Sequence, residues 1–460
     1  MKPPIAWRAE ELVRITGGHL QNLPLTAFVR GFTLDSREVR PGQVFVALQG
    51  TRFHGVRFAQ EAVERGAAVV LTDRPPTPST LPHLRVSDTQ QALLDLARVA
   101  RMRLNARVIG ITGSVGKTTT KDLLAHMLAH RYRVHAAPKS FNNFQGLPLT
   151  LLNTPEDAEV LVLELGTNHP GEMNLLASIA RPELAILTTV AEAHLGFFGS
   201  IEAIAREKAT LFYHTWPGPA FAGESLRKFA PLLRRVLPQG VELVFYGPET
   251  LGVDIEHLGL TENRWRWQGT TWRSRPGGPG PLENTLGALL VAHHLGLDWP
   301  ELQEALASFQ PPSQRLEVFT LQGITVVNDA YNANPASMEN LLQTLAPRAD
   351  AVLLVLGDML ELGAFSEALH RRVARRAYDL GFRRLVAVGR EARFYVEELQ
   401  DRAMDLLVHV PTPADAVPVL QQALRPGDIL ALKASRALAL ESLLPRLFPA
   451  PAAAQKQEAP

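Results

Sequence analysis

The sequence contains no cysteine. Disulfide bridges, thiolate metal sites and cysteine nucleophiles are therefore excluded from its fold and its chemistry. Long apolar runs are also missing, because nowhere do about 18 uncharged apolar residues follow one another. The stretch from Met1 to Gly18 has no apolar core between a basic start and a small-residue cleavage site. We therefore expect a soluble, cytoplasmic protein without stable membrane insertion.

An excess of charge of either sign is absent as well, since the formal net charge of the 460 residues is +1. Without a strong overall field, nothing indicates nucleic acid as a partner. The hydrophobic fraction of 46% and the charged fraction of 20% are those of an ordinary globular protein. At roughly 150 residues per domain, the length indicates about three domains.

The first domain is expected over residues 1–104, where short helical and strand-like patterns alternate. A helix is predicted over 9–16, closed by two glycines, and strands over 44–48 and 67–71. A longer helix, over about 89–104, leads out of this region. These patterns predict an α/β domain.

The central domain is expected over residues 105–312. It begins with an apolar strand at 107–112, then a glycine-rich loop and a helical pattern. The runs 160–164 and 184–188 are apolar without alternation, as buried parallel strands are. Residues 263–283, rich in Trp, Gly, Pro and Arg, predict an irregular strand-and-loop excursion.

The third domain is expected over residues 313–450. Its apolar runs are separated by helical patterns, which is typical of an open, Rossmann-like sheet with helices on its faces. These runs are 324–328, 351–356, 385–388 and 429–432. Residues 451–460 have no periodicity and are expected to form a disordered tail. The predicted fold is thus α/β in three domains, with a mostly parallel sheet in the central one.

The glycine-rich loop runs from Gly110 to Thr119 and reads GITGSVGKTT. In such a loop backbone N–H groups turn toward phosphate, Lys117 can reach the outer phosphates, and Thr118 can ligate magnesium. The spacing departs from GxxxxGK[ST], because Ile111 occupies the first glycine position. The predicted nucleotide-binding residues here are Gly113, Ser114, Val115, Gly116, Lys117, Thr118 and Thr119. The loop alone does not choose between hydrolysis, phosphoryl transfer and ligation.

Two polar residues follow the buried strands of the central domain. Glu164 ends the strand 160–164, and His194 follows the strand that ends near Thr188. Ligands of open α/β sheets collect at the carboxyl ends of strands, so both residues are well placed to hold a hard cation against nucleotide phosphates. Lys208 lies on a predicted helix, where position alone predicts a solvated charge.

These motifs resemble those of the Mur ligase family, whose members couple ATP to amide-bond formation through an acyl phosphate. The loop is similar to the family pattern GxTGxxGKT, including its departure from the strict spacing. Glu164 opens an ELG motif like that of the family, and His194 and Lys208 match its histidine and lysine. The resemblance implies that Lys208 is carbamylated, as in several members, and becomes a carboxylate-like ligand. The implied ligands of two Mg²⁺ ions are Thr118, Glu164, His194 and Lys208.

Other segments resemble the branch of the family that adds D-alanyl-D-alanine to UDP-N-acetylmuramoyl-tripeptide. Residues 142–148 are similar to its NNxxGxP segment, 328–335 to NDSYNANP, and 356–363 to GDMxELG. Residues 35–37 resemble a UDP-recognising domain shared with the ligase that adds diaminopimelate or lysine. The resemblance covers about residues 25–440.

The resemblance also implies roles for single residues. Arg315, which by itself reads as a surface arginine, would reach ATP when the domains close. The implied catalytic residues are Lys117, Glu164, His194, Lys208 and Arg315. Further nucleotide contacts are implied for Asn284, Asp329, Tyr331 and Asn332. Contacts with the UDP-linked precursor or the dipeptide are implied for Ser36, Asn142, Asn143, Ser435 and Arg436.

The implied reaction has two steps. The free carboxylate of the UDP-linked tripeptide attacks the γ-phosphate of ATP, giving an acyl phosphate and ADP. The amine of D-alanyl-D-alanine then attacks the acyl carbon and phosphate leaves. Because water would hydrolyse the acyl phosphate, three domains that close over the site suit this chemistry. The family also implies a monomer.

Three segments depart from the family pattern. The N-terminal FDGHxF reads FHGVRF over residues 53–58, HNxxNAL reads ENTLGAL over 283–289, and KGSR reads KASR over 433–436. They bear on uridine, adenine and amino-substrate contacts, in that order. The phosphate loop and the implied metal ligands are untouched.

Two alternatives stay open. A different Mur-type ligase would add a diamino acid or glutamates, but segments 142–148 and 328–335 argue against it, and no DNPR-type motif is found. A P-loop switch protein would need a base-reading motif such as NKxD, which is also not found. A ligase should make ADP only with both co-substrates present, whereas a switch would bind or hydrolyse nucleotide alone.

Overall fold

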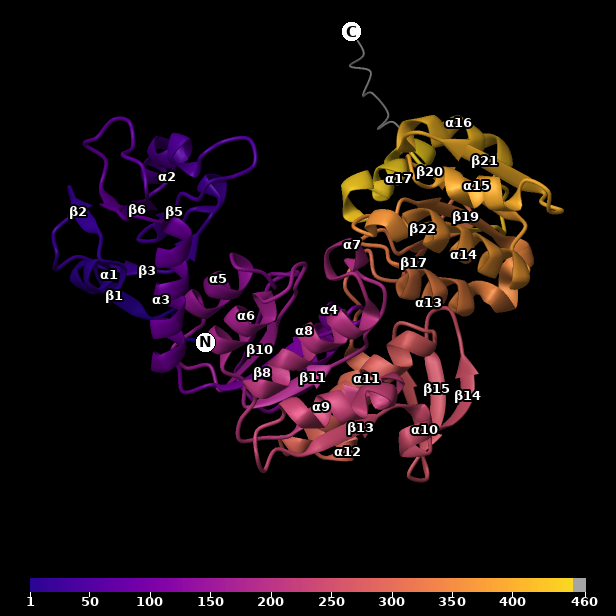
Figure 1. Ribbon diagram of the computed structural model, residues 1–460, viewed down its shortest axis with the longest axis horizontal. Coiled ribbons are helices and arrows are strands. Elements are labelled where there is room, and N and C mark those ends of the chain that lie inside the picture. The colour runs from indigo at the N-terminus through magenta and orange to yellow at the C-terminus, as the bar shows by residue number, and fades with distance from the viewer. Residues whose placement is uncertain (450–460) are drawn as a thin grey trace, which may run out of the picture.

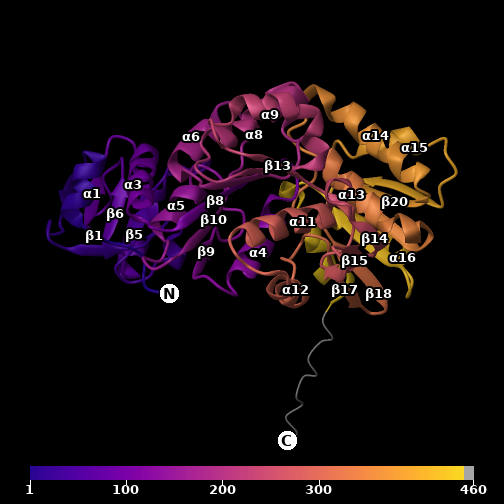
Figure 2. The same cartoon turned by 90° about the horizontal axis from the view of Figure 1, so that it is seen from below.

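The computed structural model describes residues 1–449 and contains three α/β regions, with the central one between the other two (Figures 1 and 2). Each large sheet is confined to one region, so the predicted three-domain α/β fold is confirmed. We propose the boundaries at 104/105 and 312/313, which fall between the last strand of one region and the first strand of the next. The predicted tail, 451–460, lies outside the described residues.

The first region has a five-stranded sheet in which β4 to β7 are parallel and β2 is antiparallel. Its strands in spatial order are β2 (His19–Gln21), β7 (His83–Arg85), β6 (Val69–Thr72), β5 (Val44–Val46) and β4 (Phe32–Thr33). A small antiparallel pair is formed by β1 (Ala6–Arg8) and β3 (Phe28–Arg30). The helices are α1 (Ala9–Thr16), η1 (Ser36–Glu38), η2 (Gly55–Phe58), α2 (Ala59–Glu64) and α3 (Thr89–Arg103).

Local sequence signals account for the helix ends of this region. Gly17 closes α1 in the left-handed conformation, with φ of 65°, as the two glycines predicted. Asp88 caps α3 by accepting a hydrogen bond from the backbone N–H of Gln91. Because α3 also packs against helices of the central region, it joins the first two regions.

The central region has a six-stranded, fully parallel sheet. Its strands in spatial order are β13 (Leu243–Tyr246), β12 (Ala220–Gly223), β11 (Leu184–Leu187), β8 (Arg107–Thr112), β10 (Val160–Glu164) and β9 (Val134–Ala136). Its helices before the last strand are α4 (Lys117–Leu128), α5 (Gly146–Leu152), α6 (Glu172–Ala180), α7 (Leu195–Phe198), α8 (Ile201–Tyr213), η3 (Glu224–Phe229) and α9 (Ala230–Val236). The predicted strands at 107–112 and 160–164 are confirmed. The sequence analysis did not find β9, β12 and β13.

After β13 the chain leaves the parallel sheet through α10 (Pro248–Leu251) and forms a separate antiparallel sheet. This sheet consists of β14 (Asp254–Leu258), β15 (Asn263–Trp267) and β16 (Thr270–Ser274). The prediction of an irregular excursion over 263–283 is right for its strands and wrong for its end. There Gly278 precedes α11 (Pro279–His294), because proline is tolerated in the first turn of a helix. The helix α12 (Trp299–Ser308) completes the region.

The third region has a six-stranded sheet that is parallel except for its first edge strand, β17. The strands in spatial order are β17 (Glu317–Leu321), β18 (Ile324–Asn328), β22 (Ile429–Lys433), β19 (Val352–Gly357), β20 (Arg384–Val388) and β21 (Leu406–Val410). The four predicted strands are confirmed, whereas β17 and β21 were not predicted.

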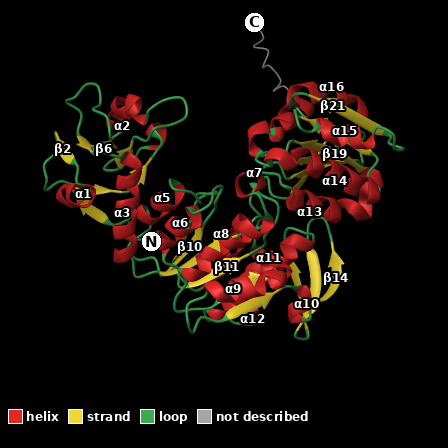
Figure 3. Ribbon diagram, viewed as in Figure 1, coloured by secondary structure: helices red, strands yellow, loops and turns green. Residues whose placement is uncertain are grey.

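Helices cover both faces of this third sheet (Figure 3). Along β19, Leu354 and Leu356 point into one buried cluster, and Leu353 and Val355 point into another. The helices are α13 (Pro335–Leu345), η4 (Ala346–Ala351), η5 (Gly363–Phe365), α14 (Ser366–Asp379), α15 (Arg393–Leu399), α16 (Pro413–Ala423), η6 (Arg436–Leu438), η7 (Leu440–Leu443) and α17 (Leu444–Leu447). Within residues 1–449, no helix has the length and apolar character needed to cross a membrane.

Candidate active site

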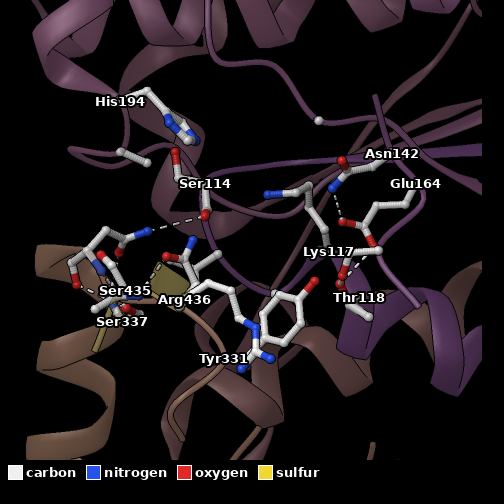
Figure 4. A pocket seen from close by; sticks show the side chains of 18 of the residues that line it. Ser114, Lys117, Thr118, Asn142, Glu164, His194, Tyr331, Ser337, Ser435 and Arg436 are labelled. Carbon is white, nitrogen blue, oxygen red and sulfur yellow. Dashed lines mark hydrogen bonds between the residues drawn. The ribbon is translucent and has the colours of Figure 1, made fainter. Parts of the chain in front are cut away.

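A cavity of about 760 Å³ is bordered by all three regions. The central region contributes the phosphate loop and the ends of its strands, and the third region contributes residues that follow β18 and β22 (Figure 4). The first region contributes Gln90 from α3. Most predicted site residues line it: Ser114, Val115, Gly116, Lys117, Thr118, Thr119, Asn142, Asn143, Glu164, His194, Asn284, Arg315, Asp329, Tyr331, Asn332, Ser435 and Arg436. Gly113, Lys208 and Ser36 do not line it.

The phosphate loop joins β8 to α4 in a conformation that requires glycine. Gly113 has φ of 153°, and a Cβ there would lie 1.9 Å from Oγ1 of Thr188. Gly116, with φ of 88°, precedes α4, and a Cβ there would meet the side chain of Asn284 at 2.2 Å. The backbone of the loop therefore packs directly against its neighbours, which fixes the direction of its N–H groups.

Lys117 begins α4, and its Nζ donates a hydrogen bond to the carbonyl oxygen of Gly113 at 2.8 Å. Burial lowers the pKa of Lys117; the carboxylate of Glu164 opposes this shift and the guanidinium of Arg315 adds to it. Because the ammonium group bends back over its own loop, it lies where phosphate oxygens bind in loops of this kind.

Thr118, Glu164 and Asn142 form a hydrogen-bonded group on one side of the cavity (Figure 4). Oγ1 of Thr118 donates to Oε2 of Glu164 at 2.7 Å, and Nδ2 of Asn142 donates to Oε1 of the same carboxylate at 2.7 Å. The hydroxyl of Ser140 lies 3.2 Å from Oγ1 of Thr118. Glu164 is almost completely buried, with 1% of its surface exposed, so its charge depends on these partners.

These groups suit a small hard cation. Hydroxyl and carboxylate oxygens are ligands that Mg²⁺ takes in proteins, and it keeps several waters, so few protein ligands are needed. Among residues 1–449, no group of three or more His, Asp or Glu side chains converges as a metal site. The donor set therefore fits Mg²⁺ only when the hydroxyls of Thr118 and Ser140 are counted with Glu164.

His194 lies apart from this oxygen cluster. It precedes α7 in the left-handed conformation, with φ of 57°, and its Nδ1 contacts Oε2 of Glu361 in the third region. The backbone N–H of Gly196 also donates to the carbonyl oxygen of Glu361, at 3.0 Å. A Cβ on Gly196 would lie 2.8 Å from the backbone nitrogen of Gly363, so the two chain segments touch through glycine. The structure thus places His194 at the contact between the central and third regions.

Lys208, on α8, is buried with 2% of its surface exposed, so the expectation of a solvated helix charge was wrong. The helix packs against β8 and β11, which places this face of α8 in the core. Burial lowers the pKa of Lys208 to about 7, with the positive charge of Lys117 acting in the same direction and Glu207 opposing the shift. A substantial fraction of its amine is therefore uncharged at neutral pH.

Arg315 comes from the third region and reaches the central one. Its Nη2 donates to the hydroxyl of Ser140 at 3.1 Å, and its guanidinium lies 4.1 Å from the centre of the Tyr331 ring. The expectation of a surface arginine is replaced by a half-buried side chain that links two domains. Arg315 and Thr118 contact the same serine, so positive charge and the oxygen cluster lie next to each other.

Asp329 and Asn332 follow β18 and line the same wall of the cavity as Tyr331. Oδ2 of Asp329 pairs with Nζ of Lys433 at 2.5 Å, and the carbonyl oxygen of Asn332 accepts from the same Nζ at 3.1 Å. Nearby, Nδ2 of Asn334 lies 3.4 Å from the carbonyl oxygen of Ser114. Segment 328–335 is therefore adjacent to the phosphate loop, as a nucleotide contact requires.

Ser435 and Arg436 line the cavity, but local contacts also engage them. Oγ of Ser435 accepts from the backbone N–H of Leu360 at 2.9 Å. Arg436 donates to the side-chain oxygen of Gln314 at 3.2 Å and pairs with Glu441. Both side chains lie on the third-region side of the cavity, opposite Lys117 and Thr118 (Figure 4).

Ser36 lies outside the cavity, at the start of η1, where its hydroxyl donates to Oε2 of Glu61 at 2.8 Å. In segment 53–58, which departs from the family pattern, Nε2 of His54 lies 2.7 Å from Oδ1 of Asp73, and Nδ1 accepts from the backbone N–H of Val56. These two contacts of the His54 ring stabilise the loop that contains it.

Packing explains the glycine at position 287, where segment 283–289 departs from the family pattern HNxxNAL. A Cβ on Gly287 would lie 2.6 Å from the ring of Tyr246, so a larger residue is excluded while the tyrosine is present. On the preceding turn of α11, burial raises the pKa of Glu283 to about 7, with the nearby carboxylate of Glu224 acting in the same direction. Asn284 keeps its place against the phosphate loop.

Among the cavity residues that the sequence analysis did not assign to the site, three contact residues that it did assign: Ser140, Glu361 and Lys433. Glu361 and Lys433 lie in segments that resemble family motifs, GDMxELG and KGSR, so a signal was present. Ser140 lies in an irregular loop after Pro138, where one hydroxyl residue carries no pattern. Only its distances to Thr118 and Arg315 identify it.

Comparison with known proteins agrees with this geometry. Residues 29–101 match the description "Mur ligase family, catalytic domain", residues 111–279 match "Mur ligase middle domain", and residues 314–436 match "Mur ligase, glutamate ligase domain". The chain belongs to the Mur ligase family, which confirms the resemblance in its motifs.

Individual relatives are similar over almost the whole chain. The UDP-N-acetylmuramoyl-tripeptide--D-alanyl-D-alanine ligase of Bacillus subtilis is 32% identical over 92% of this chain and 94% of its own. A crystal structure of MurF from Acinetobacter baumannii has a TM-score of 0.86 at 28% identity, covering 97% and 99% of the two chains. The MurF ligase from Thermotoga maritima in complex with ADP has a TM-score of 0.77 at 29% identity, covering 91% and 97%.

Proposed function

We propose that this chain is an ATP-dependent ligase that joins D-alanyl-D-alanine to UDP-N-acetylmuramoyl-tripeptide, giving the UDP-linked pentapeptide, ADP and phosphate. One observation carries the proposal most directly. The phosphate loop of the central region faces Arg315 and Asp329 of the third region across one cavity, in a chain that is 32% identical to a ligase of that name. The reaction belongs to the cytoplasmic stage of peptidoglycan precursor synthesis.

ATP is the proposed nucleotide. The Thermotoga protein forms a complex with ADP and shares the fold over 91% of this chain. In this chain residues 114–119 of the phosphate loop, Asn284, Asp329, Tyr331 and Asn332 line one cavity, and Gly113 shapes the loop without lining it. We assign these groups to the nucleotide, with Lys117 and Arg315 nearest the transferred phosphate.

Magnesium is proposed as the metal, with Thr118, Glu164 and Ser140 as the oxygen donors that fit it. Bound there, the ion would neutralise charge on the phosphates during transfer. His194 and Lys208 remain the proposed ligands of a second ion. In the described structure His194 contacts Glu361 instead, so we propose that this contact opens or rearranges when the second ion binds.

The chain's own groups have three tasks in this reaction. Lys117 and Arg315 place positive charge where negative charge develops on the phosphoryl oxygens, which lowers the barrier in a site that excludes water. The three regions around the cavity limit the access of water to the acyl phosphate. Ser435 and Arg436, on the opposite wall, are proposed to hold the dipeptide with its amine toward the acyl carbon.

Carbamylation of Lys208 is proposed on chemical grounds. An uncharged amine attacks the carbon of CO₂, and one proton is lost as the carbamate forms. The pKa of about 7 makes this amine available at neutral pH, whereas an ordinary lysine would be almost fully protonated. The product carries a negative charge and two oxygen donors.

The remaining assignments concern the precursor and the assembly. Asn142 and Asn143, at the cavity edge, are proposed to contact the peptide of the UDP-linked precursor, and Ser36 its uridine nucleotide in the first region. Asn143 also holds its own turn, because its Oδ1 accepts from the backbone N–H groups of Gln145 and Gly146. We propose a cytoplasmic monomer that acts on small molecules.

The proposal is tested by measuring phosphate release from ATP and Mg²⁺ with the two co-substrates supplied separately and together. Release that requires both, with a UDP-linked pentapeptide in the mass spectrum, is expected. Release without D-alanyl-D-alanine would favour another Mur-type ligase. Hydrolysis of ATP without either co-substrate would favour a P-loop switch protein.

A further inference from the structure

Lys433 is the last residue of β22, and only 2% of its side chain is exposed. Its Nζ lies 2.5 Å from Oδ2 of Asp329, 3.1 Å from the carbonyl oxygen of Asn332, and 3.5 Å from the carbonyl oxygen of Asp329. A lysine ammonium has three donors and no acceptor. All three donors of the Lys433 ammonium group therefore face the segment that follows β18. The group is engaged by partners within the protein.

The carboxylate of Asp329 connects Lys433 to a third segment. Its Oδ2 faces Lys433, whereas its Oδ1 accepts a hydrogen bond from the backbone N–H of Leu316 at 3.2 Å. Leu316 follows Arg315 directly. A chain of contacts thus runs from Lys433 at the end of β22, through Asp329 just after β18, to the backbone beside Arg315.

The backbone on both sides of Arg315 is in an unfavourable conformation. Gln314 has φ of 60° and Leu316 has φ of 52°, which places two residues with side chains in the left-handed region. Such conformations cost free energy, most for bulky side chains, and persist only where the surroundings hold them. Contacts that hold this turn include the Asp329 carboxylate on the backbone N–H of Leu316, and Tyr331, whose backbone N–H donates to the carbonyl oxygen of Gln314 at 3.3 Å. Gln314 is also held by Glu317, whose Oε2 accepts from its backbone N–H at 3.0 Å, and by Arg436, which donates to its side-chain oxygen.

The two left-handed residues determine where Arg315 goes. Between them the side chain leaves the third region, lies over the Tyr331 ring, and donates to Ser140 of the central region. Relaxation of either residue would turn the guanidinium away from Ser140 and Thr118. The position of the arginine therefore depends on contacts made several residues away.

We propose that Lys433 is a positioning residue for Arg315. It fixes the carboxylate of Asp329, which holds the left-handed turn and so keeps the guanidinium beside the phosphate loop. Lys433 acts inside the protein, although its neighbours Ser435 and Arg436 are proposed to face the dipeptide. This inference rests on the proposed ligase function, because Arg315 is assigned there to the phosphates.

The test is a double-mutant cycle in the full-length chain with Lys433→Met and Arg315→Met, singly and together. For each variant kcat and KM for ATP and for D-alanyl-D-alanine are measured, and calorimetry gives the Kd of a non-hydrolysable ATP analogue with Mg²⁺. We expect Lys433→Met to lower kcat/KM for ATP about tenfold or more, and to change KM for the dipeptide less than about twofold. In the Arg315→Met background the same change should cost less than about twofold.

A matched control separates positioning from general loss of stability. Arg384 and Asp428 form a partly buried ion pair in the same region, with Nη1 and Oδ1 2.8 Å apart, and neither residue lines the cavity. Arg384→Met should lower the melting temperature, leave kcat/KM for ATP unchanged, and combine additively with Arg315→Met. Lys433→Arg, which keeps the charge and the donors, should retain more kcat/KM than Lys433→Met.

If Lys433→Met does not fold, Lys433→Gln, which removes the charge but keeps a hydrogen-bond donor, takes its place in the cycle. If the Lys433 change lowers kcat/KM for ATP equally in the wild-type and the Arg315→Met backgrounds, the inference is overturned. An effect confined to the KM for the dipeptide would also overturn it. If the wild-type protein releases no phosphate, the ligase proposal fails. The Kd values for the ATP analogue then decide the inference. It is supported if the effects of the Lys433 and Arg315 changes on this Kd are non-additive, and overturned if they are additive.

Discussion

Oγ1 of Thr118 donates a hydrogen bond to Oε2 of Glu164 at 2.7 Å, although 46 residues separate them in the sequence. Thr118 lies in the first turn of α4, shortly after β8, and Glu164 ends β10; the two residues meet at the carboxyl ends of these neighbouring parallel strands. Because the carboxylate is buried, the hydrogen bonds from the Thr118 hydroxyl and the Asn142 amide stabilise it in place of water.

Glu164→Gln keeps the size of this side chain and removes its charge. We expect kcat to fall by about 100-fold or more, because removal of an electrostatic group that acts in the transition state typically costs that much. The concentration of Mg²⁺ needed for half-maximal activity should also rise. The matched control, Thr118→Ser, keeps the hydroxyl and should retain most of the activity; unchanged Mg²⁺ dependence in the glutamine variant would contradict the assignment.

Lys208→Met should raise the stability of the metal-free protein while abolishing its activity. The folded pKa is about 7 and the ordinary value 10.5, so between these values the unfolded chain holds a proton that the folded chain has released. Lys208 therefore lowers the free energy of unfolding by its full amount below pH 7, and by less as the pH rises toward 10.5. Each unit of pKa shift corresponds to about 1.4 kcal/mol.

Thermal unfolding of the wild type and Lys208→Met at pH 6.5 and pH 9.5, with chelator and without CO₂, measures this effect. The gain in melting temperature should be larger at pH 6.5. Lys228→Met, a change at another lysine of the same region, serves as the control. Equal gains at the two pH values would show that the amine is not buried as described.

Glu283→Gln should stabilise the protein above pH 7 and have little effect near pH 4.5. Burial and Glu224 raise the pKa of Glu283 from 4.5 to about 7, so the folded chain binds more protons than the unfolded chain between these values. Stability from this group is thus present at low pH and is lost as the pH rises to about 7. Denaturant unfolding at pH 5 and pH 8 compares the two proteins, and a gain at pH 5 as large as that at pH 8 would be inconsistent with the shift.

Gly196→Ala should weaken the contact between the central and third regions without unfolding either. Its Cβ would lie 2.8 Å from the backbone nitrogen of Gly363 and 3.1 Å from the carbonyl oxygen of Glu361. We expect about a tenfold loss of kcat, because closure of the regions around the cavity is impaired. The melting temperature should change little, and small-angle scattering should show a more open shape.

Phe197→Ala is the control for this change, because that side chain is 46% exposed and lies beside the same contact. It should leave both shape and kcat close to those of the wild type. A Gly196→Ala protein with normal scattering and normal kcat would show that the glycine contact is dispensable.

The strands that were predicted well are continuous apolar runs buried at every position, such as β10 and β19. Apolar runs of this length between turn signals are typical of buried parallel strands. Two of the missed strands, β9 and β17, are only half buried, so pairing with neighbouring strands makes them strands. The missed β12 is buried at every position but has only four residues, AFAG, which give a weak strand signal. Helix α11 was misread because Gly278 and Pro279 are typical of both a loop and a helix start.

Residues close together along the chain were enough to predict the phosphate loop, the strand that ends in Glu164, and the family. The groups that meet from distant segments are known from the folded structure alone. Folding brought Ser140 to Thr118, His194 to Glu361, and Lys433 to Asp329. It also buried Lys208, whose surroundings come from packing between a helix and a sheet. Burial, and distance across domains, are properties of the folded chain, and no local pattern encodes them.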